Sequence, residues 1–209
     1  GTAFREVASP EAALSVPPSH LPVWPMDFGP PASPGQPRAE HAAGVVTAIA
    51  RGVEMVQAGQ AAGITTLPIH KKALKDGAGF ACPGHTEYLA SLAGVDRVVM
   101  MLACDTLRVV PATIHIPLSA VPGALTPDLL EGVIRITRAG LIRDFAVAAP
   151  RLAVAGLNPH AGEGGTMGDE EARIIAPVRD RLRAEGFDLQ GPLPADTMFH
   201  PAARARYDA

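Results

Sequence analysis

The chain has 209 residues, of which 47% are hydrophobic and 19% charged, and its 18 basic and 21 acidic side chains give a net charge of −3 at pH 7. This length suffices to bury a substantial core, and the charge gives no electrostatic reason to expect nucleic acid or an anionic membrane as a partner. Gly, Pro, Arg and Asp interrupt every apolar run, so the sequence predicts no membrane span and favours a soluble protein that binds a small metabolite.

The first 37 residues contain nine prolines, each of which fixes φ and removes a backbone donor. We therefore expect residues 1–37 to form an extended lead-in with a short edge strand at 21–24, and a polyproline docking motif is the alternative. Residues 38–209 would form the body of the protein. Within it, apolar residues recur at steps of three and four over 39–59, which predicts a long amphipathic helix.

The next segments predict short elements. A strand is expected at 63–67, a basic helical turn around 71–75, and a short helix after Gly84. Two apolar runs, 97–103 and 107–115, are separated by three polar or small residues, a spacing typical of a hairpin.

The C-terminal half alternates helix and strand. Thr126 followed by Pro127 predicts a capped helix that ends before Pro150. A fully buried strand is then expected at 151–157, a helix at 169–184 kinked by Pro177, and a strand at 188–192. This alternation favours a layered α/β fold with a mixed or largely parallel sheet, in which ligands gather at the carboxyl ends of the strands.

The strongest candidate site is the glycine-rich segment 156–165, between a predicted strand and a predicted helix. Asn158, His160 and Glu163 are polar groups among its glycines, and glycine lets backbone amides approach an anion closely. The alternative is a glycine-rich turn with a surface histidine. The glycines do not match the dinucleotide-binding motif GxGxxG.

Other candidates are scattered along the chain. His115 closes an apolar run, so it and His160 could meet at adjacent strand ends on a divalent cation, although a structural histidine is the alternative. His85 could bind substrate or act as an acid or base, and Thr86 beside it could simply cap a helix. Asp196 follows the last predicted strand, where it could orient a histidine, hold a substrate amine or form an Asx-turn.

Two features concern the origin of the chain. Cys82 and Cys104 form no CxxC pair, which favours a reducing cytoplasm over a disulfide scaffold. The first residues lack the apolar region of a signal peptide, and the chain begins with Gly1 rather than Met. We interpret this start as that of a fragment or a processed chain.

Taken together, these segments resemble the 4-hydroxythreonine-4-phosphate dehydrogenase family of pyridoxal phosphate biosynthesis. The most specific motifs are Asn158-Pro-His-Ala-Gly-Glu-Gly-Gly165 and Gly84-His-Thr-Glu87. The resemblance covers roughly residues 38–200 in the family's order, and its other stretches are 68–71, 98–103, 107–109, 112–117 and 191–197.

The resemblance implies an isocitrate/isopropylmalate dehydrogenase-like α/β/α fold of two lobes, with the active site at a homodimer interface. It implies NAD or NADP as cofactor and a divalent metal, of which zinc suits imidazole ligands best and magnesium, cobalt or manganese are alternatives. His115 and His160 match metal ligands, His85 and Thr86 match substrate-binding positions, and Asp196 matches an acidic residue near the substrate hydroxyl.

This chain also departs from the family. Members are longer at both ends, and they supply a third histidine ligand beyond the position of Ala209. We therefore keep two alternatives to the family enzyme: a paralogue acting on 4-phospho-D-threonate or 4-phospho-D-erythronate, and a fragment that folds without catalysing turnover.

Overall fold

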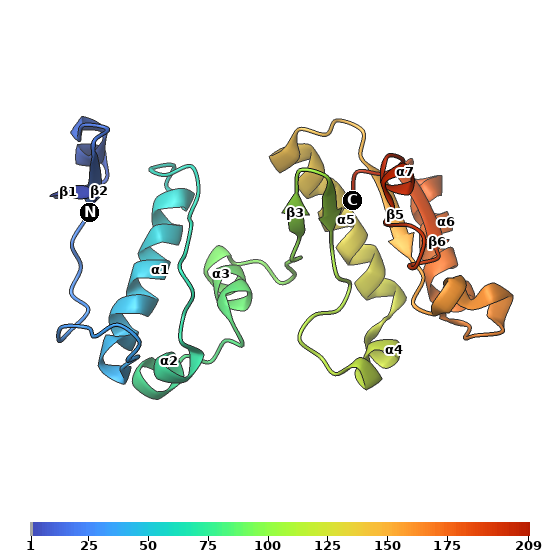
Figure 1. The fold of residues 1–209 in the computed structure, drawn as a ribbon, viewed down its shortest axis with the longest axis horizontal. Coiled ribbons are helices and arrows are strands. Elements are labelled where there is room, and N and C mark those ends of the chain that lie inside the picture. Colours follow the sequence, from blue (N-terminus) through green and yellow to red (C-terminus); the bar gives the residue numbers. More distant parts are fainter. Residues whose placement is uncertain (1) are drawn as a thin grey trace. The chain divides into compact units, whose positions relative to one another are not determined.

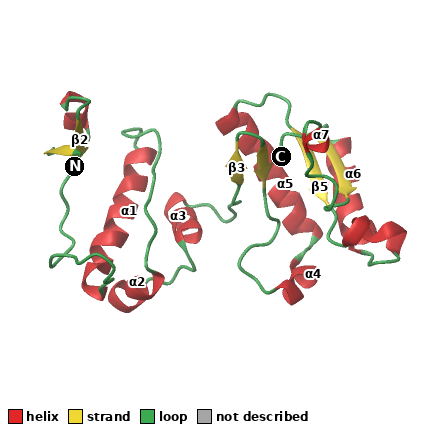
Figure 2. Ribbon diagram, viewed as in Figure 1, coloured by secondary structure: helices red, strands yellow, loops and turns green. Residues whose placement is uncertain are grey.

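The computed structural model describes residues 2–209, which fall into two compact units, one reaching to Asp96 and the other spanning Arg97–Ala209 (Figure 1). Both units contain helices and strands (Figure 2), so the expectation of a mixed helix and strand fold is confirmed, and strand and helix alternate only in the last part of the chain, from β5 to α7. The described strands form three separate two-stranded pairs. Residue 38, where we expect the lead-in to end, lies inside the first unit. None of the helices in residues 2–209 is both long and apolar enough to cross a membrane.

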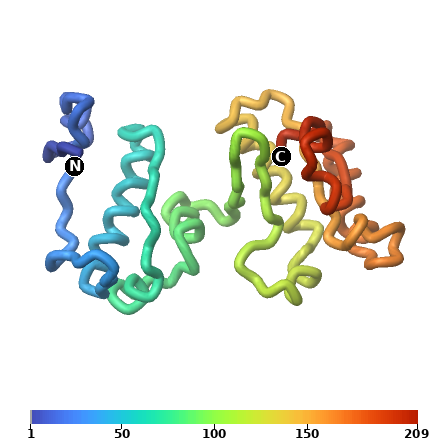
Figure 3. Tube along the Cα trace, viewed as in Figure 1, coloured from blue at the N-terminus to red at the C-terminus, as the bar shows by residue number. Residues whose placement is uncertain are grey.

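The first unit opens with a small parallel pair of strands, β1 (Ala3–Glu6) and β2 (His20–Val23). The edge strand expected at 21–24 is therefore confirmed, shifted by one residue. After β2 the chain forms no helix or regular strand up to the first helices (Figure 3), apart from a turn bridged by Ser33 and Gln36, in agreement with its many prolines.

Three helices form the rest of this unit. A short 3₁₀ turn leads into α1 (Ala42–Gln57), which packs against α2 (Lys71–Ala78) and α3 (His85–Ala93). The small core contains Ala42, Leu74 and Phe80, and the ring of Phe80 meets that of Tyr88 edge to face with centroids 5.1 Å apart. The predicted amphipathic helix is thus confirmed, because its apolar face covers the other two helices.

The strand expected at 63–67 is wrong: these residues are extended but pair with no described strand. Leu67 is 85% exposed, whereas the side chain of Ile64 lies against Gly52 of α1. A run of β-branched residues forms a strand only beside a partner, and none of the described residues supplies one here.

The second unit begins with the expected hairpin, which is shorter than its apolar runs. β3 (Leu102–Cys104) and β4 (Leu107–Val109) are antiparallel and are joined by a turn at Asp105 and Thr106. A short helix, α4 (Val121–Ala124), follows.

The long helix α5 (Pro127–Phe145) confirms the prediction from its cap. The hydroxyl of Thr126 accepts the N–H of Leu129 at 3.1 Å, and the helix ends before Pro150 at Ala146, whose φ is 55°. Local signals therefore suffice to place this helix.

A parallel strand pair connected through a helix completes the unit. β5 (Arg151–Ala155) pairs with β6 (Asp188–Leu193), and α6 (Ala176–Ala184) lies between them in the sequence. Only Leu152 of β5 is buried, so the expectation of a fully buried strand is wrong. A four-residue helix, α7 (Pro201–Arg204), lies near the end of the chain.

A π-helical turn, Glu171–Ile175, leads into α6. Pro177 has no N–H to donate to the carbonyl four residues earlier, and a wider turn accommodates this loss. The irregularity that Pro177 predicts inside the 169–184 helix is therefore confirmed.

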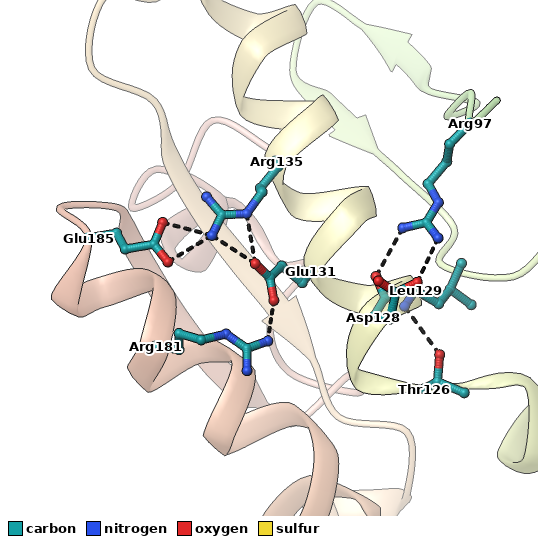
Figure 4. Close-up of polar contacts among 8 residues, drawn as sticks. All are labelled: Arg97, Thr126, Asp128, Leu129, Glu131, Arg135, Arg181 and Glu185. Atoms are coloured by element: carbon teal, nitrogen blue, oxygen red, sulfur yellow. Dashed lines mark hydrogen bonds and ion pairs between the residues drawn. The ribbon is translucent and has the colours of Figure 1, made fainter. Parts of the chain in front are cut away.

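The core of the second unit lies between α5, α6 and the β5–β6 pair. Its fully buried side chains are those of Leu141, Val178, Leu182 and Leu189. At the rim, Glu131 of α5 is paired with Arg135 and with Arg181 of α6 (Figure 4). The hydrogen bond from Arg135 lowers the pKa of Glu131. These side chains are partly exposed to solvent, so the ion pairs contribute little to the stability of the fold.

Candidate active site

The carboxyl ends of β5 and β6 bring together an imidazole and a carboxylate. Nδ1 of His160, which follows β5, lies 3.5 Å from Oδ2 of Asp196, which follows β6. Because the two strands are parallel neighbours, the segments that leave them emerge at the same edge. Both side chains are about half exposed, so the pair is open to a ligand.

The segment that carries His160, Pro159–Gly165, folds as a left-handed turn, which we call the His160 turn. Its φ angles are 50° at His160, 55° at Ala161 and 40° at Glu163, and the intervening Gly162 and Gly164 have positive φ as well. A left-handed conformation costs an L-residue about 1–2 kcal/mol, so the surrounding structure must hold three strained residues in place.

Hydrogen bonds from Asn158, at the start of this turn, reach two glutamates at the start of the following helix. The backbone N–H of Asn158 donates to Oε1 of Glu171 at 2.7 Å, and its side-chain amide donates to Oε2 of Glu171 at 2.9 Å. The same amide donates to Oε2 of Glu170 at 2.7 Å. Asn158, the residue just before the His160 turn, is thus hydrogen-bonded to the helix that follows the turn.

Glu171 is only 5% exposed, which is unusual for a carboxylate. Burial raises its pKa, but the hydrogen bonds from Asn158 outweigh burial, and the net effect is a lowered pKa. Glu171 is therefore a buried carboxylate whose negative charge is stabilised by the N–H groups of Asn158.

Two glycines allow the His160 turn to pack this closely. A Cβ on Gly156 would lie 2.8 Å from Cα of Ala161, and a Cβ on Gly162 would lie 2.8 Å from Oε2 of Glu171. Both approaches are closer than real Cβ contacts, so side chains are excluded at both positions.

His115 is placed differently from our expectation. β4 ends at Val109, so His115 lies in the loop beyond it, exposed and with φ of 59°, rather than at the end of a strand. Strand β4 is shorter than the apolar run 107–115 because Pro111 has no backbone N–H to donate to a neighbouring strand.

His85 and Thr86 belong to the first unit. The N-cap of α3 is Gly84, so the interpretation of Thr86 as an N-cap is wrong. Nε2 of His85 is buried and has no hydrogen-bond partner in the described chain. Lys71 and Glu87 both lie close to Gly84, with Nζ of Lys71 3.4 Å and Oε2 of Glu87 3.2 Å from a Cβ placed there. The basic turn and the Gly84 segment are therefore neighbours.

A complete metal site is not formed by the described residues. Within residues 2–209, no group of three or more His, Cys, Asp or Glu side chains lies close enough to hold an ion. The chemistry of an imidazole with a neighbouring carboxylate suits a divalent metal, but further donors would be needed to complete the coordination.

An apolar cavity of about 370 Å³ lies beside the site in the second unit. Its wall includes Val133 of α5, Val154 and Gly156 at the exit of β5, and Met198 and Tyr207 near the end of the chain. The hydroxyl of Tyr207 donates to the carbonyl of Met198 at 2.8 Å, which holds the last turn against this wall.

The residue that sequence reasoning missed is Glu171. Its position carried a signal, because 171, 174, 175, 178 and 182 follow helical spacing and the other four are buried apolar residues. A carboxylate on the apolar face of a helix predicts a buried polar partner.

The fold and the site together define a class. A glycine-rich junction between a parallel strand and a helix, with polar side chains at adjacent strand ends, is typical of α/β proteins that bind a small ligand at this edge.

Comparison with known proteins gives the family. The model of the family described as pyridoxal phosphate biosynthetic protein PdxA matches residues 2–209, and the chain belongs to this family. A 4-hydroxythreonine-4-phosphate dehydrogenase of Paracoccus denitrificans is 63% identical over 213 residues, which cover 100% of this chain and 66% of that protein. The homologue from Ruegeria is 58% identical over 99% of this chain and 63% of its own length. The chain thus spans about two thirds of the length of these relatives.

Solved structures agree with this assignment. The crystal structure of 4-hydroxythreonine-4-phosphate dehydrogenase from Klebsiella pneumoniae matches 99% of this chain and 62% of its own, with a TM-score of 0.90 and 36% identity. A terephthalate 1,2-cis-dihydrodiol dehydrogenase from Burkholderia xenovorans matches with a TM-score of 0.64 and 26% identity, over 95% of this chain and 61% of its own.

Proposed function

We propose that the protein acts as a 4-hydroxythreonine-4-phosphate dehydrogenase in pyridoxal 5'-phosphate biosynthesis. The family match over residues 2–209 carries the proposal, and the contact between His160 and Asp196 at the strand ends supports it. The substrate would be 4-phosphohydroxy-L-threonine, oxidised at its secondary alcohol and then decarboxylated as the resulting β-keto acid. NAD or NADP would be the oxidant.

Asp196 and His160 have complementary roles in this proposal. In one role, Oδ2 of Asp196 accepts the proton of the substrate hydroxyl while the hydride leaves the carbon that carries this hydroxyl. In the other, Asp196 binds the substrate amine. His160, together with His115, serves as a ligand of a divalent cation, for which zinc is favoured over magnesium, cobalt and manganese. A bound cation would supply polarisation of the substrate's hydroxyl and keto oxygens, and a bound nicotinamide would supply the hydride acceptor.

His85 and Thr86 bind the substrate in this proposal. The buried Nε2 of His85 lacks a partner in the described chain, which supports a hydrogen bond to a substrate oxygen or a proton relay. Thr86 positions the substrate beside it. The glycine-rich His160 turn brings the cation ligand to the edge where the substrate carboxylate would lie.

The finer architecture belongs to the same proposal. We infer an isocitrate/isopropylmalate dehydrogenase-like α/β/α arrangement, a homodimer whose active site lies at the interface, and a cytoplasmic location. The cation would need at least one further ligand besides His115 and His160.

The test is direct. The purified protein is incubated with 4-phosphohydroxy-L-threonine, NAD and zinc, and NADH formation is followed by absorbance, with NADP in a parallel series. NADH formation that a chelator abolishes, and that His160→Ala abolishes as well, would support the proposal. Turnover retained in His160→Ala would remove the role of His160 as a metal ligand.

Two alternatives predict other outcomes. The structural similarity to a terephthalate dihydrodiol dehydrogenase indicates that similar folds serve other alcohols. NADH formation only with 4-phospho-D-threonate or 4-phospho-D-erythronate would therefore identify a paralogue. Because the chain spans about two thirds of its relatives, a folded protein without turnover on any of these substrates would identify a non-catalytic portion.

A further inference from the structure

We propose that Glu171 is a positioning residue that holds His160 at the mouth of β5, acting through Asn158 and Gly162. The inference rests on the proposed function in one respect: that function explains why the position of His160 matters. Its structural part concerns how the His160 turn is held, which can be measured without turnover.

The first argument is the strain of the His160 turn. Three residues with side chains, His160, Ala161 and Glu163, adopt left-handed backbone conformations. At about 1–2 kcal/mol each, such a turn would relax in isolation. Within the turn, hydrogen bonds bind Ala161 to Asn158 and Met167 to Gly162, but both are internal to the loop and do not tie it to a neighbouring element.

The second argument is that Glu171 supplies this tie. Its two oxygens accept the backbone and side-chain N–H groups of Asn158 at 2.7 and 2.9 Å, two residues before His160. Its Oε2 also lies 2.8 Å from the position that a Cβ on Gly162, two residues after His160, would occupy. The carboxylate therefore lies against the chain on both sides of His160, and its residue is only 5% exposed.

The third argument concerns polarity. The side-chain amide of Asn158 donates one proton to Glu170 and one to Glu171, so both donors of one NH₂ group are used. Both oxygens of Glu171 accept from Asn158, so in Glu171→Gln the new NH₂ group must face either the backbone N–H or the side-chain NH₂ of Asn158, and two donors then oppose each other. Replacing both lets Asn158 turn its amide over and accept from both new NH₂ groups, while the remaining oxygen of residue 171 still accepts the backbone N–H.

This polarity gives a test that distinguishes positioning from general stability. Three variants are compared with the wild type: Glu171→Gln, Glu170→Gln and the double variant. The ring signals of His160 are recorded by NMR on histidine-labelled protein at one pH and are assigned by their loss in His160→Asn. Urea unfolding of each variant is measured in parallel.

We expect Glu171→Gln to shift or broaden the His160 ring signals while the other histidines stay unchanged, and the double variant to restore them. Glu170→Gln, which leaves the bonds of Glu171 in place, should have the smaller effect of the two single variants. Unchanged His160 signals in a folded Glu171→Gln protein would overturn the proposal, as would a double variant no closer to wild type than Glu171→Gln.

Activity adds a second readout that separates this proposal from the proposed function. In a preparation that turns over 4-phosphohydroxy-L-threonine, Glu171→Gln should lower kcat by about 100-fold, as expected for a misplaced group, with a smaller change in KM. The double variant should recover part of kcat. Shifted His160 signals in a protein without turnover would support the positioning role and contradict the proposed function, whereas normal kcat in Glu171→Gln would contradict the positioning role alone.

Discussion

The imidazole of His160 and the carboxylate of Asp196 face each other at 3.5 Å across the ends of two parallel strands. This separation exceeds that of a good hydrogen bond, so each group keeps its capacity to bind a ligand, and the two are close enough to contact the same one. A substrate hydroxyl that approaches the pair from the solvent side would contact both groups.

We therefore expect Asp196→Asn to lower kcat by about 100-fold or more under the proposed function, because an amide cannot accept the hydroxyl proton as a carboxylate does. Its effect on folding should be small, since the side chain of Asp196 is about half exposed. Steady-state NADH formation and urea unfolding check the two parts.

Asp180→Asn is the matched control, because Asp180 is an exposed carboxylate of α6 paired with Arg179. It should leave kcat unchanged. Equal activity of Asp196→Asn and Asp180→Asn would remove Asp196 from the reaction.

The sequence predicts those parts of the fold that have local signals. The cap at Thr126 places α5, and the turn residues around Asp105 place the β3–β4 hairpin. The strand expected at 63–67 fails because a strand depends on a partner that local sequence does not reveal. Thr86 fails as an N-cap because Gly84 already begins the helix.

The candidate site was predictable to the same extent. The glycine pattern points to the segment of His160, and the strand pattern places Asp196 after β6. The contact between them depends on strands that are parallel neighbours, which periodicity alone does not establish. The left-handed backbone at Ala161 was not predictable, because alanine rarely adopts that conformation, and histidine adopts it too seldom for His160 to predict it alone.

A second prediction concerns acid stability. Oδ2 of Asp208 accepts the backbone N–H of Arg151 at 2.8 Å, and Oδ1 accepts from its guanidinium at 2.9 Å. The hydrogen bond from the Arg151 side chain lowers the pKa of Asp208 below its unfolded value. The pair therefore stabilises the fold above about pH 4, and this contribution is lost as the pH falls through the lowered pKa.

Asp208→Asn should reduce the free energy of unfolding by about 1–2 kcal/mol at neutral pH, and the difference from wild type should vanish in acid. Urea unfolding across the acid range measures both. Asp105→Asn, at an exposed turn, serves as the control. A difference that persists undiminished below the lowered pKa would show that the charge of Asp208 is not the cause.

A third prediction tests the core of the second unit. Leu141 of α5 is fully buried, so Leu141→Ala should cost about 2–5 kcal/mol through lost burial and the cavity that remains. Leu118→Ala, at a side chain that is 90% exposed, should change stability by less than about 0.5 kcal/mol. Urea unfolding compares the two, and equal losses would contradict the packing of α5 described above.

The last prediction compares two glycines of the His160 turn. Gly162 and Gly164 have similar φ angles, 78° and 68°, so an alanine pays a similar conformational cost of about 1–2 kcal/mol at either position. Only at Gly162 would the new Cβ also meet the carboxylate of Glu171, at 2.8 Å, whereas nothing lies within 4 Å at Gly164. Gly162→Ala should therefore be the more destabilising by at least about 1 kcal/mol in urea unfolding. Because Glu171 is held by Asn158, it cannot simply move aside, and Gly162→Ala should also disturb the His160 ring signals while Gly164→Ala leaves them close to wild type. Equal unfolding free energies for the two variants would mean that Glu171 does not press against the turn.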